Sequence, residues 1–215
     1  MDQSQYARQL RKARTHLASQ CDSLNAWMSE YGRCAIQVAW QRSPYEALVR
    51  AIAFQQLHGK AAQSILNRLI AACPKDDFPS PKSITGFTVE QMRSFGFSMA
   101  KVASIHGIAQ AAIDGQIPTR AEAEKLDDEE LIARLIELRG VGRWTVEMLL
   151  MFTLGRMDVM PVDDYGVKAG VAHLFELPEL PKKAQMLELT EHWRPFRSIG
   201  AWYMWRLLEA KRVKE

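Results

Sequence analysis

Apolar residues recur along much of the chain with the spacing of one helix face rather than the alternation of a strand. Between residues 44 and 73 they run from Leu48 to Ile70 at helical intervals. Ser43 and Pro44 precede them, a pair typical of an N-cap and a first helical turn. The pattern predicts a helix over 44–73.

Helical periodicity of apolar residues continues beyond this segment. It predicts further helices over 89–95, 98–115, 129–138, 143–155, 166–175 and 198–211. A connector rich in Pro and Asp occupies 73–87, and no segment shows strand alternation or a repeat of fixed period. The expected fold is all-α, with about nine to eleven short helices.

The order of these segments favours a single two-lobed unit. A central lobe is expected over about 44–160, and residues 1–43 and 161–215 are expected to pack together as the second lobe. A groove between two helical lobes is where a ligand site most often forms. We therefore expect the functional site in the inter-lobe groove.

Composition narrows the class of protein. The chain has 215 residues, of which 47% are hydrophobic and 25% charged, the values of an ordinary globular protein. Three cysteines are too few for a four-cysteine metal or iron–sulfur site. The chain start lacks a secretory apolar region, and no apolar run is long enough for a membrane span. These features predict a reduced, intracellular, cytoplasmic or nucleoid-associated protein with no membrane partner.

Charge is unevenly placed although the formal net charge is only +3. Residues 121–130 hold six acids and one lysine, residues 1–20 hold four basic side chains and one acid, and residues 194–215 hold six basic side chains and two acids. Such asymmetry lets a nearly neutral protein present one basic face. The simpler alternative, solvated helix surfaces, stays open on charge alone.

A short connection between two predicted helices carries the clearest chemical signal. Gly140 and Gly142 bracket Val141, and glycines there leave the backbone bare, so that successive N–H groups can converge on an anion at the start of the next helix. Arg139 and Arg143 would add charge beside a DNA phosphate. The segment therefore favours a DNA-binding helix–hairpin–helix.

The stretch 137–170, ELRGVGRWTVEMLLMFTLGRMDVMPVDDYGVKAG, resembles the signature of the helix–hairpin–helix DNA glycosylases, and most of all the AlkA-like 3-methyladenine-DNA glycosylase II branch. Residues 51–62 resemble the family's first DNA-contacting helix, 95–109 its lobe-bridging segment and 192–205 its closing helix. Together these cover most of 44–208. The length leaves no room for the N-terminal β-domain of some members, so the chain resembles the short form.

The resemblance implies an activity and partners. It implies a monofunctional hydrolase that flips alkylated purines such as 3-methyladenine out of double-stranded DNA and cuts their N-glycosidic bond, in base excision repair. It implies a monomer that needs no cofactor and no metal bound by side chains. A monovalent cation held by hairpin carbonyl groups is the one ion that the family suggests.

An acidic pair follows the hairpin. A fixed carboxylate can stabilise the positive charge that develops on deoxyribose when the glycosidic bond breaks, and can orient water. Asp163 and Asp164 are the candidates, and by analogy with AlkA-like enzymes the second, Asp164, is the catalytic residue. Asp163 would then cap the following helix or act as a local hydrogen-bond acceptor. The reverse assignment stays open.

The family's bifunctional members place a lysine two residues after the second hairpin glycine, where it attacks the sugar. In this chain that position is Trp144, and Lys168 lies one helical turn beyond Asp164. Without a placed amine, water is the expected nucleophile, so no lyase activity is expected.

Aromatic residues suggest a pocket for a cationic base, because electron-rich ring faces attract positive charge. The resemblance to AlkA-like enzymes implies a base pocket with Trp205 and, nearby, Trp144; Tyr165 and Phe54 complete the expected pocket. Leu57 lies where the family places the wedge that fills the gap left by a flipped base, and Lys101 is a further candidate for a phosphate contact. The expected DNA contacts are Arg139, Gly140, Val141, Gly142, Arg143, Thr145, Gln56, Leu57, His58 and Lys60.

Two other functions compete with this hypothesis. A non-catalytic helix–hairpin–helix module could bind damaged DNA, although binding alone needs neither the acidic pair nor the aromatic set. An all-α protein-interaction domain without a nucleic-acid role is the third possibility.

Overall fold

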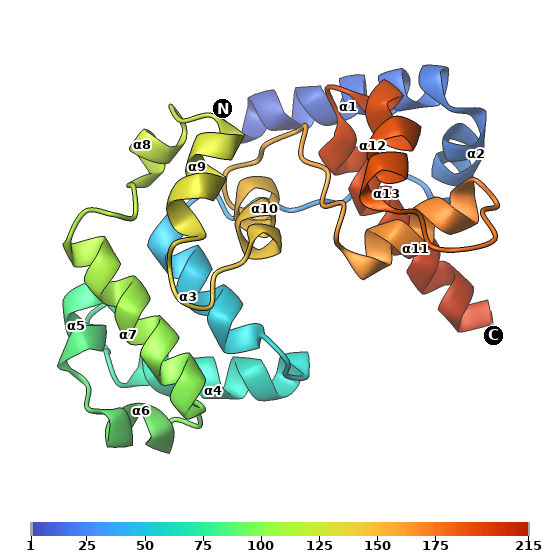
Figure 1. Cartoon of the computed structure of the whole chain (residues 1–215). Helices are drawn as coiled ribbons and strands as arrows, with labels where there is room; N and C mark the ends of the chain where they lie inside the picture. Colours follow the sequence, from blue (N-terminus) through green and yellow to red (C-terminus); the bar gives the residue numbers. More distant parts are fainter. Residues whose placement is uncertain (1, 215) are drawn as a thin grey trace. The chain divides into compact units, whose positions relative to one another are not determined.

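The computed structural model describes residues 2–214, with side chains for residues 2–211. Over this range the chain forms thirteen α-helices and one 3₁₀ helix, η1, and no strand (Figure 1). The all-α prediction is therefore confirmed. Of the expected basic C-terminal side chains, those of Arg212 and Lys214 lie outside the described part.

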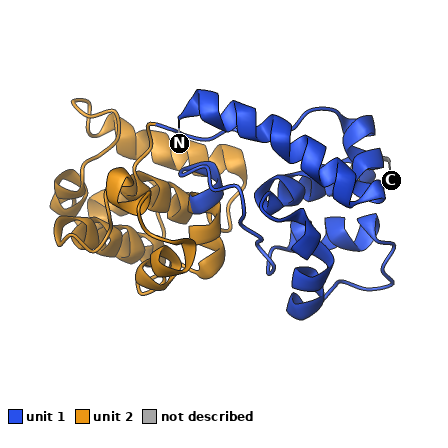
Figure 2. Cartoon of the chain, turned by 90° about the horizontal axis from the view of Figure 1, so that it is seen from above, with its two compact units in different colours: residues 1–40, 150–215 blue, residues 41–149 orange. Residues whose placement is uncertain are grey.

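The chain divides into two compact units. Unit 1 combines residues 1–40 with 150–215, and unit 2 spans residues 41–149 (Figure 2). Residues 150–160, expected in the central lobe, thus belong to unit 1. There the Ala39 N–H donates to the Phe152 carbonyl at 2.8 Å, which ties this stretch to the N-terminal segment.

Unit 2 is built around α7 (Met99–Ile113), against which several other helices pack. Its elements are α3 (Pro44–Phe54), α4 (Gly59–Ala71), α5 (Pro81–Gly86), α6 (Val89–Ser94), α7 (Met99–Ile113), α8 (Arg120–Ala123), α9 (Asp128–Leu135) and the first part of α10 (Arg143–Phe152). Helices α3, α5 and α6 all pack on α7. Fully buried Leu66, Ile105 and Leu135 form part of the core, so its apolar area comes from several helices.

Unit 1 joins the two ends of the chain. Its helices, besides the end of α10, are α1 (Gln3–Gln20), α2 (Asp22–Tyr31), α11 (Tyr165–Leu174), α12 (Lys183–Thr190), η1 (Glu191–Trp193) and α13 (Arg197–Lys214). Helix α11 packs closely on α13, where a Cβ at Gly170 would lie 2.5 Å from the Met204 carbonyl oxygen. The glycine therefore sets the distance between these two helices.

The predicted helix over 44–73 is wrong in one respect, because residues 55–58 interrupt it. Gln56 has φ 55°, a left-handed conformation that a continuous right-handed helix does not contain. The apolar period continues through the break, since α3 and α4 both bury residues on unit 2's core. For this reason the periodicity alone did not reveal the interruption.

The described residues offer neither a membrane-spanning helix nor a cluster of metal-binding side chains. No helix in residues 2–214 is both long and apolar enough to cross a membrane. No group of three His, Cys, Asp or Glu side chains within residues 2–211 could hold a metal ion.

Candidate functional site

Asp164 lies directly before α11 and caps it. Its Oδ1 accepts a hydrogen bond from the Val167 N–H at 2.8 Å. The same oxygen accepts a second from the indole Nε1–H of Trp205, on α13, also at 2.8 Å. Donors from two helices therefore fix the orientation of this carboxylate.

Trp205 is held in place by its neighbours. Its indole is half-buried and lies in a tilted stack with Phe152, with ring centroids 5.8 Å apart and planes at 32°. A Cβ at Gly166 would lie 2.7 Å from Trp205 Cδ1 and 3.1 Å from its Nε1. Gly166 thus allows the indole to reach Asp164, and this residue was missed in the sequence, where DDYG was read only for its acids and Tyr165.

The structure corrects the division of roles within the acidic pair. Asp163 was expected to cap the helix, but Asp164 is the cap and Asp163 lies in the exposed turn before it. Tyr165, expected in the base pocket, begins α11 and is 61% exposed. It is next to Asp164 in the chain and open to a ligand.

The loop between α10 and Asp164 is pinned to the start of α13. Asp158 accepts hydrogen bonds from Arg197 Nε at 2.7 Å and Arg194 Nη1 at 2.7 Å. Ser198 Oγ accepts from the Val159 N–H at 2.9 Å. These contacts fix the position of the loop that precedes Asp164. No sequence motif had indicated a role for the residues that form them.

The hairpin of unit 2 depends on Gly140. Its φ is 81°, and a Cβ there would lie 2.7 Å from Ser104 Oγ and 3.3 Å from Ile52 Cδ1. A side chain is therefore excluded both by the backbone conformation and by contact with α7 and α3. Gly142 has no described neighbour within 4 Å of such a Cβ and no left-handed φ.

Two of the expected DNA contacts point inward instead. Thr145 is 4% exposed and Val141 is 5% exposed, so neither side chain can contact DNA directly. Thr145 was a wrong choice because it falls on the core face of α10, next to fully buried Val146. Val141 is confined to a main-chain role, and its N–H already donates to the Leu138 carbonyl at 3.0 Å.

Arg143 is engaged by two carboxylates. It binds Glu129 through both terminal nitrogens and Glu147 through Nε at 3.1 Å, and Glu147 is buried. The pKa of Arg143 is raised, mainly by its hydrogen bond with Glu129. This arrangement favours a structural role over the expected phosphate contact. Arg139, by contrast, is exposed on the hairpin.

The loop 55–58 is tied to the hairpin. Gln55 Nε2 donates to the Gly140 carbonyl at 3.0 Å, and Gln56 adopts its left-handed φ of 55°. Leu57, the expected wedge, is 41% exposed, and His58 is exposed beside it as the N-cap of α4. The structure thus brings the wedge loop and the hairpin together within unit 2 through Gln55, which belongs to the predicted wedge segment but had no role of its own.

The remaining candidates occupy other parts of unit 2. Phe54 ends α3 and Trp144 lies in the first turn of α10, and both are partly exposed. Lys60 is exposed on α4. Lys101 donates to the Ala53 carbonyl at 2.8 Å, near the C-terminal end of α3, and partial burial lowers its pKa. This hydrogen bond favours a structural role for Lys101 over the expected phosphate contact.

Hairpin carbonyl groups were the expected ligands of a monovalent cation. Two of them, those of Leu138 and Gly140, already accept hydrogen bonds from the Val141 N–H and the Gln55 amide.

Comparison with known proteins agrees with this geometry. A family model described as HhH-GPD superfamily base excision DNA repair protein matches residues 49–195. DNA-3-methyladenine glycosylase 1 of Schizosaccharomyces pombe is 49% identical over 77% of this chain and 73% of that protein. An alkylbase DNA glycosidase-like protein of the same organism is 38% identical over 92% of this chain and 93% of that protein.

Solved structures show the same fold. The S. pombe 3-methyladenine DNA glycosylase in complex with abasic DNA has a TM-score of 0.81 and 43% identity, covering 91% of this chain and 95% of that one. A DNA-3-methyladenine glycosidase from Bacillus halodurans has a TM-score of 0.83 and 26% identity, covering 93% of this chain and 90% of that one. With the family model matching most of its length, the chain belongs to the HhH-GPD superfamily of base excision DNA repair proteins.

Proposed function

We propose that this protein releases alkylated purines, 3-methyladenine among them, from double-stranded DNA by hydrolysis, as a DNA-3-methyladenine glycosylase of type II. The observation that carries the proposal is the Asp164 carboxylate, oriented by Val167 and Trp205. The names of the relatives support the lesion class.

In the proposed reaction the bond between C1′ of deoxyribose and the base nitrogen breaks, and the electron pair leaves with the base. An alkylated purine carries positive charge and becomes neutral on leaving, so it departs readily. The sugar is left with positive charge, which the Asp164 anion stabilises. Water then adds at C1′ and gives up a proton, and an abasic site remains.

Aromatic side chains near Asp164 suit this substrate. The Trp205 indole adjoins the carboxylate, and Tyr165 is exposed next to it in the chain. Ring faces attract a cationic base by roughly 0.5–2 kcal/mol. We propose both as base-pocket residues, while Trp144 and Phe54 remain predictions.

We propose that the enzyme has no lyase activity, because Trp144 occupies the position where bifunctional relatives are expected to carry lysine. Borohydride reduction during turnover tests this directly. No covalent protein–DNA adduct should form, whereas a trapped adduct would show an amine nucleophile and refute the hydrolytic mechanism.

DNA contact is proposed for the hairpin and the loop 55–58. Gly140 shapes the backbone beside exposed Arg139, and Leu57 is exposed on the adjoining loop. The expected role of Leu57 is to fill the gap that a flipped base leaves. We expect the protein to act as a monomer.

The main test measures free 3-methyladenine released from methylated duplex DNA. Asp164→Asn should lower release by at least about 100-fold, because it removes the charge that stabilises the sugar cation. Asparagine is as good an N-cap as aspartate, so α11 should keep its start. Asp163→Asn is the matched control, one residue away and exposed, and should keep activity near that of the wild type.

Each other outcome has a definite meaning. Loss of release in Asp163→Asn alone would transfer the catalytic role to Asp163. Wild-type protein that binds duplex DNA but releases no base from any methylated duplex would instead support the non-catalytic binding module.

A further inference from the structure

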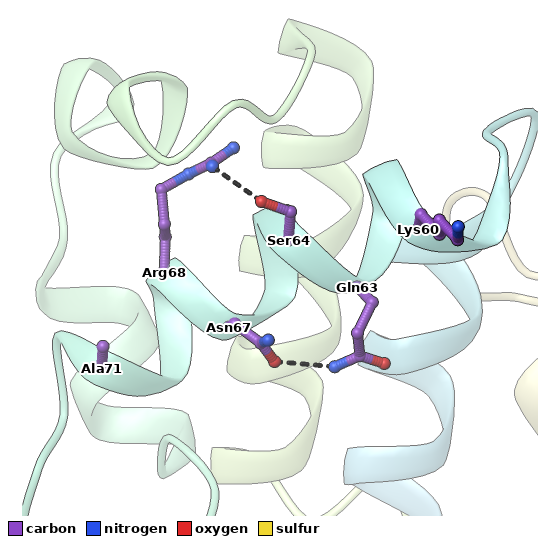
Figure 3. Close-up of a pocket in the computed structure, with 6 residues that line it drawn as sticks. All are labelled: Lys60, Gln63, Ser64, Asn67, Arg68 and Ala71. Atoms are coloured by element: carbon purple, nitrogen blue, oxygen red, sulfur yellow. Dashed lines mark hydrogen bonds between the residues drawn. The ribbon is translucent and has the colours of Figure 1, made fainter.

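One face of α4 lies outside the site described so far. Its exposed side chains, here called the α4 row, come from successive turns of a single helix (Figure 3). The α4 row consists of Lys60, Gln63, Ser64, Asn67 and Arg68. On the opposite side, Ala62, Leu66 and Leu69 are buried in unit 2, so the row faces solvent.

The row has an unusual charge pattern. It contains two cations, two amides and a hydroxyl, and no Asp or Glu occurs anywhere between Glu46 and Asp76. The whole chain holds 25 acids in 215 residues, and residues 121–130 alone hold six, so acids are not scarce in general. A donor-rich surface without carboxylates fits a polyanion, since nothing on it repels phosphate.

Part of the row is ordered in advance. Arg68 Nη1 donates to Ser64 Oγ at 3.1 Å (Figure 3). Arg68 Nε donates to the Phe95 carbonyl at 2.7 Å. Gln63 Nε2 donates to Asn67 Oδ1 at 2.7 Å. Side chains already held in place lose little conformational freedom when a ligand arrives.

The row also continues the proposed DNA surface. Helix α4 begins at Gly59, directly after the loop that carries Leu57 and His58. Lys60 and Arg68 are eight positions apart, or about 12 Å along the helix. At about 3.4 Å of duplex axis per nucleotide in one strand, this length matches three to four phosphates.

We propose that the α4 row binds the phosphate backbone of duplex DNA, extending the contact made by loop 55–58 to one side of the lesion. This inference rests on the proposed function, because it places DNA at that loop. The row supplies affinity and register without reading the base sequence.

The test uses Asn67, which the site described above does not include. At low salt, Asn67→Glu should weaken binding to a lesion-containing duplex about fivefold, and Asn67→Lys should strengthen it by a similar factor, because each adds one charge beside phosphates. Thr85→Glu on α5, also exposed, is the matched control and should leave affinity unchanged. Melting temperatures of all three should match that of the wild type.

Two further measurements sharpen the result. Lys60→Gln should reduce the slope of log affinity against log salt by about 0.9, the loss of one phosphate contact. Shortening the duplex on one side of the lesion, but not on the other, should abolish the difference between Asn67→Glu and wild type.

The outcomes separate this inference from the proposed function. If wild-type protein binds duplex DNA but Asn67→Glu and Thr85→Glu have equal affinity, the α4 row does not contact DNA and only this inference fails. If wild-type protein does not bind duplex DNA at all, the proposed function itself fails.

Discussion

Two parts of the protein are built on different principles. One is the group of Asp164, Trp205 and Gly166 in unit 1, here called the Asp164 corner. The other is the hairpin with its adjoining loop 55–58 in unit 2. At Asp164, side chains converge, with Trp205 donating to the carboxylate and Gly166 leaving room for it. At the hairpin, the backbone itself is shaped, by left-handed conformations at Gly140 and Gln56. A charged transition state calls for one oriented group, whereas a DNA backbone calls for a surface of fixed shape.

This difference predicts that mutations in the two regions separate into distinct classes. Changes at the Asp164 corner should affect release of the base more than DNA affinity. Changes at the hairpin and loop should affect DNA affinity and stability more than the chemical step.

After Asp164→Asn, the largest effect is expected for Trp205→Phe. The ring and its stack on Phe152 are retained, but the Nε1–H donor to Asp164 is lost. A hydrogen bond to a charged group contributes about 1.5–3 kcal/mol, so single-turnover base release should fall by about 10- to 100-fold. DNA affinity, measured by fluorescence anisotropy, should stay within about twofold. A loss confined to affinity would contradict the division between the regions.

Gly140→Ala should have the next largest effect. Alanine at φ 81° is strained and its Cβ would meet Ser104, so stability should fall by about 1–3 kcal/mol and DNA affinity by about tenfold. Urea unfolding measures the change in stability, and fluorescence anisotropy measures the change in DNA affinity. Gly142→Ala, with open space around its Cβ, is the control and should change stability by less than 1 kcal/mol. Equal losses in both variants would show that the hairpin shape does not depend on Gly140.

Arg143→Gln should act on stability rather than on DNA. It leaves buried Glu147 without its guanidinium partner, and the free energy of unfolding should fall by about 2–3 kcal/mol. DNA affinity of the folded variant should change less than threefold, since this cation is taken up by carboxylates. The double variant Arg143→Gln/Glu147→Gln should regain most of the stability. A large loss of affinity at full stability would restore the phosphate role first expected for Arg143.

The smallest effect is expected for Gln55→Met. Methionine has a similar length but no donor for the Gly140 carbonyl, so the loop should lose its tie to the hairpin. One neutral hydrogen bond contributes about 1 kcal/mol, which corresponds to a fivefold loss of DNA affinity at most. The rate of base release from saturated enzyme should not change. A fall in that rate without a fall in DNA affinity would show that Gln55 acts on base release, as the residues of the Asp164 corner are expected to do.

Much of the fold followed from sequence patterns. Helical periodicity identified the all-α class, and the glycine pair at 140 and 142 located the hairpin. The break at 55–58 was not predicted, because apolar periodicity continues through it. Its positive φ falls on Gln56, and only a glycine there would have indicated such a conformation in the sequence. The helices of residues 3–31 were not assigned, although Asp2 forms a capping box with Gln5 that would have marked the first of them.

The site was predicted less completely than the fold. Asp164 and Trp205 were predicted as site residues by resemblance, but the hydrogen bonds that hold them were not predicted. The pairing of Arg143 with Glu129, fourteen positions away, and of Asp158 with Arg197 depends on how distant segments fold back, which spacing does not show. The inward position of Thr145 follows from the rotation of α10, which residue spacing around the hairpin does not show.

The double duty of Asp164 has a consequence for the history of this protein. The residue that is proposed to stabilise the sugar cation is also the cap on which α11 begins. The side chains that accept a hydrogen bond from the first turn of a helix are chiefly those of Asp, Asn, Ser and Thr. A descendant that lost catalysis would therefore still gain about 1 kcal/mol of stability by keeping one of these side chains here, and a change from Asp to Asn is expected to reduce base release while leaving the fold intact.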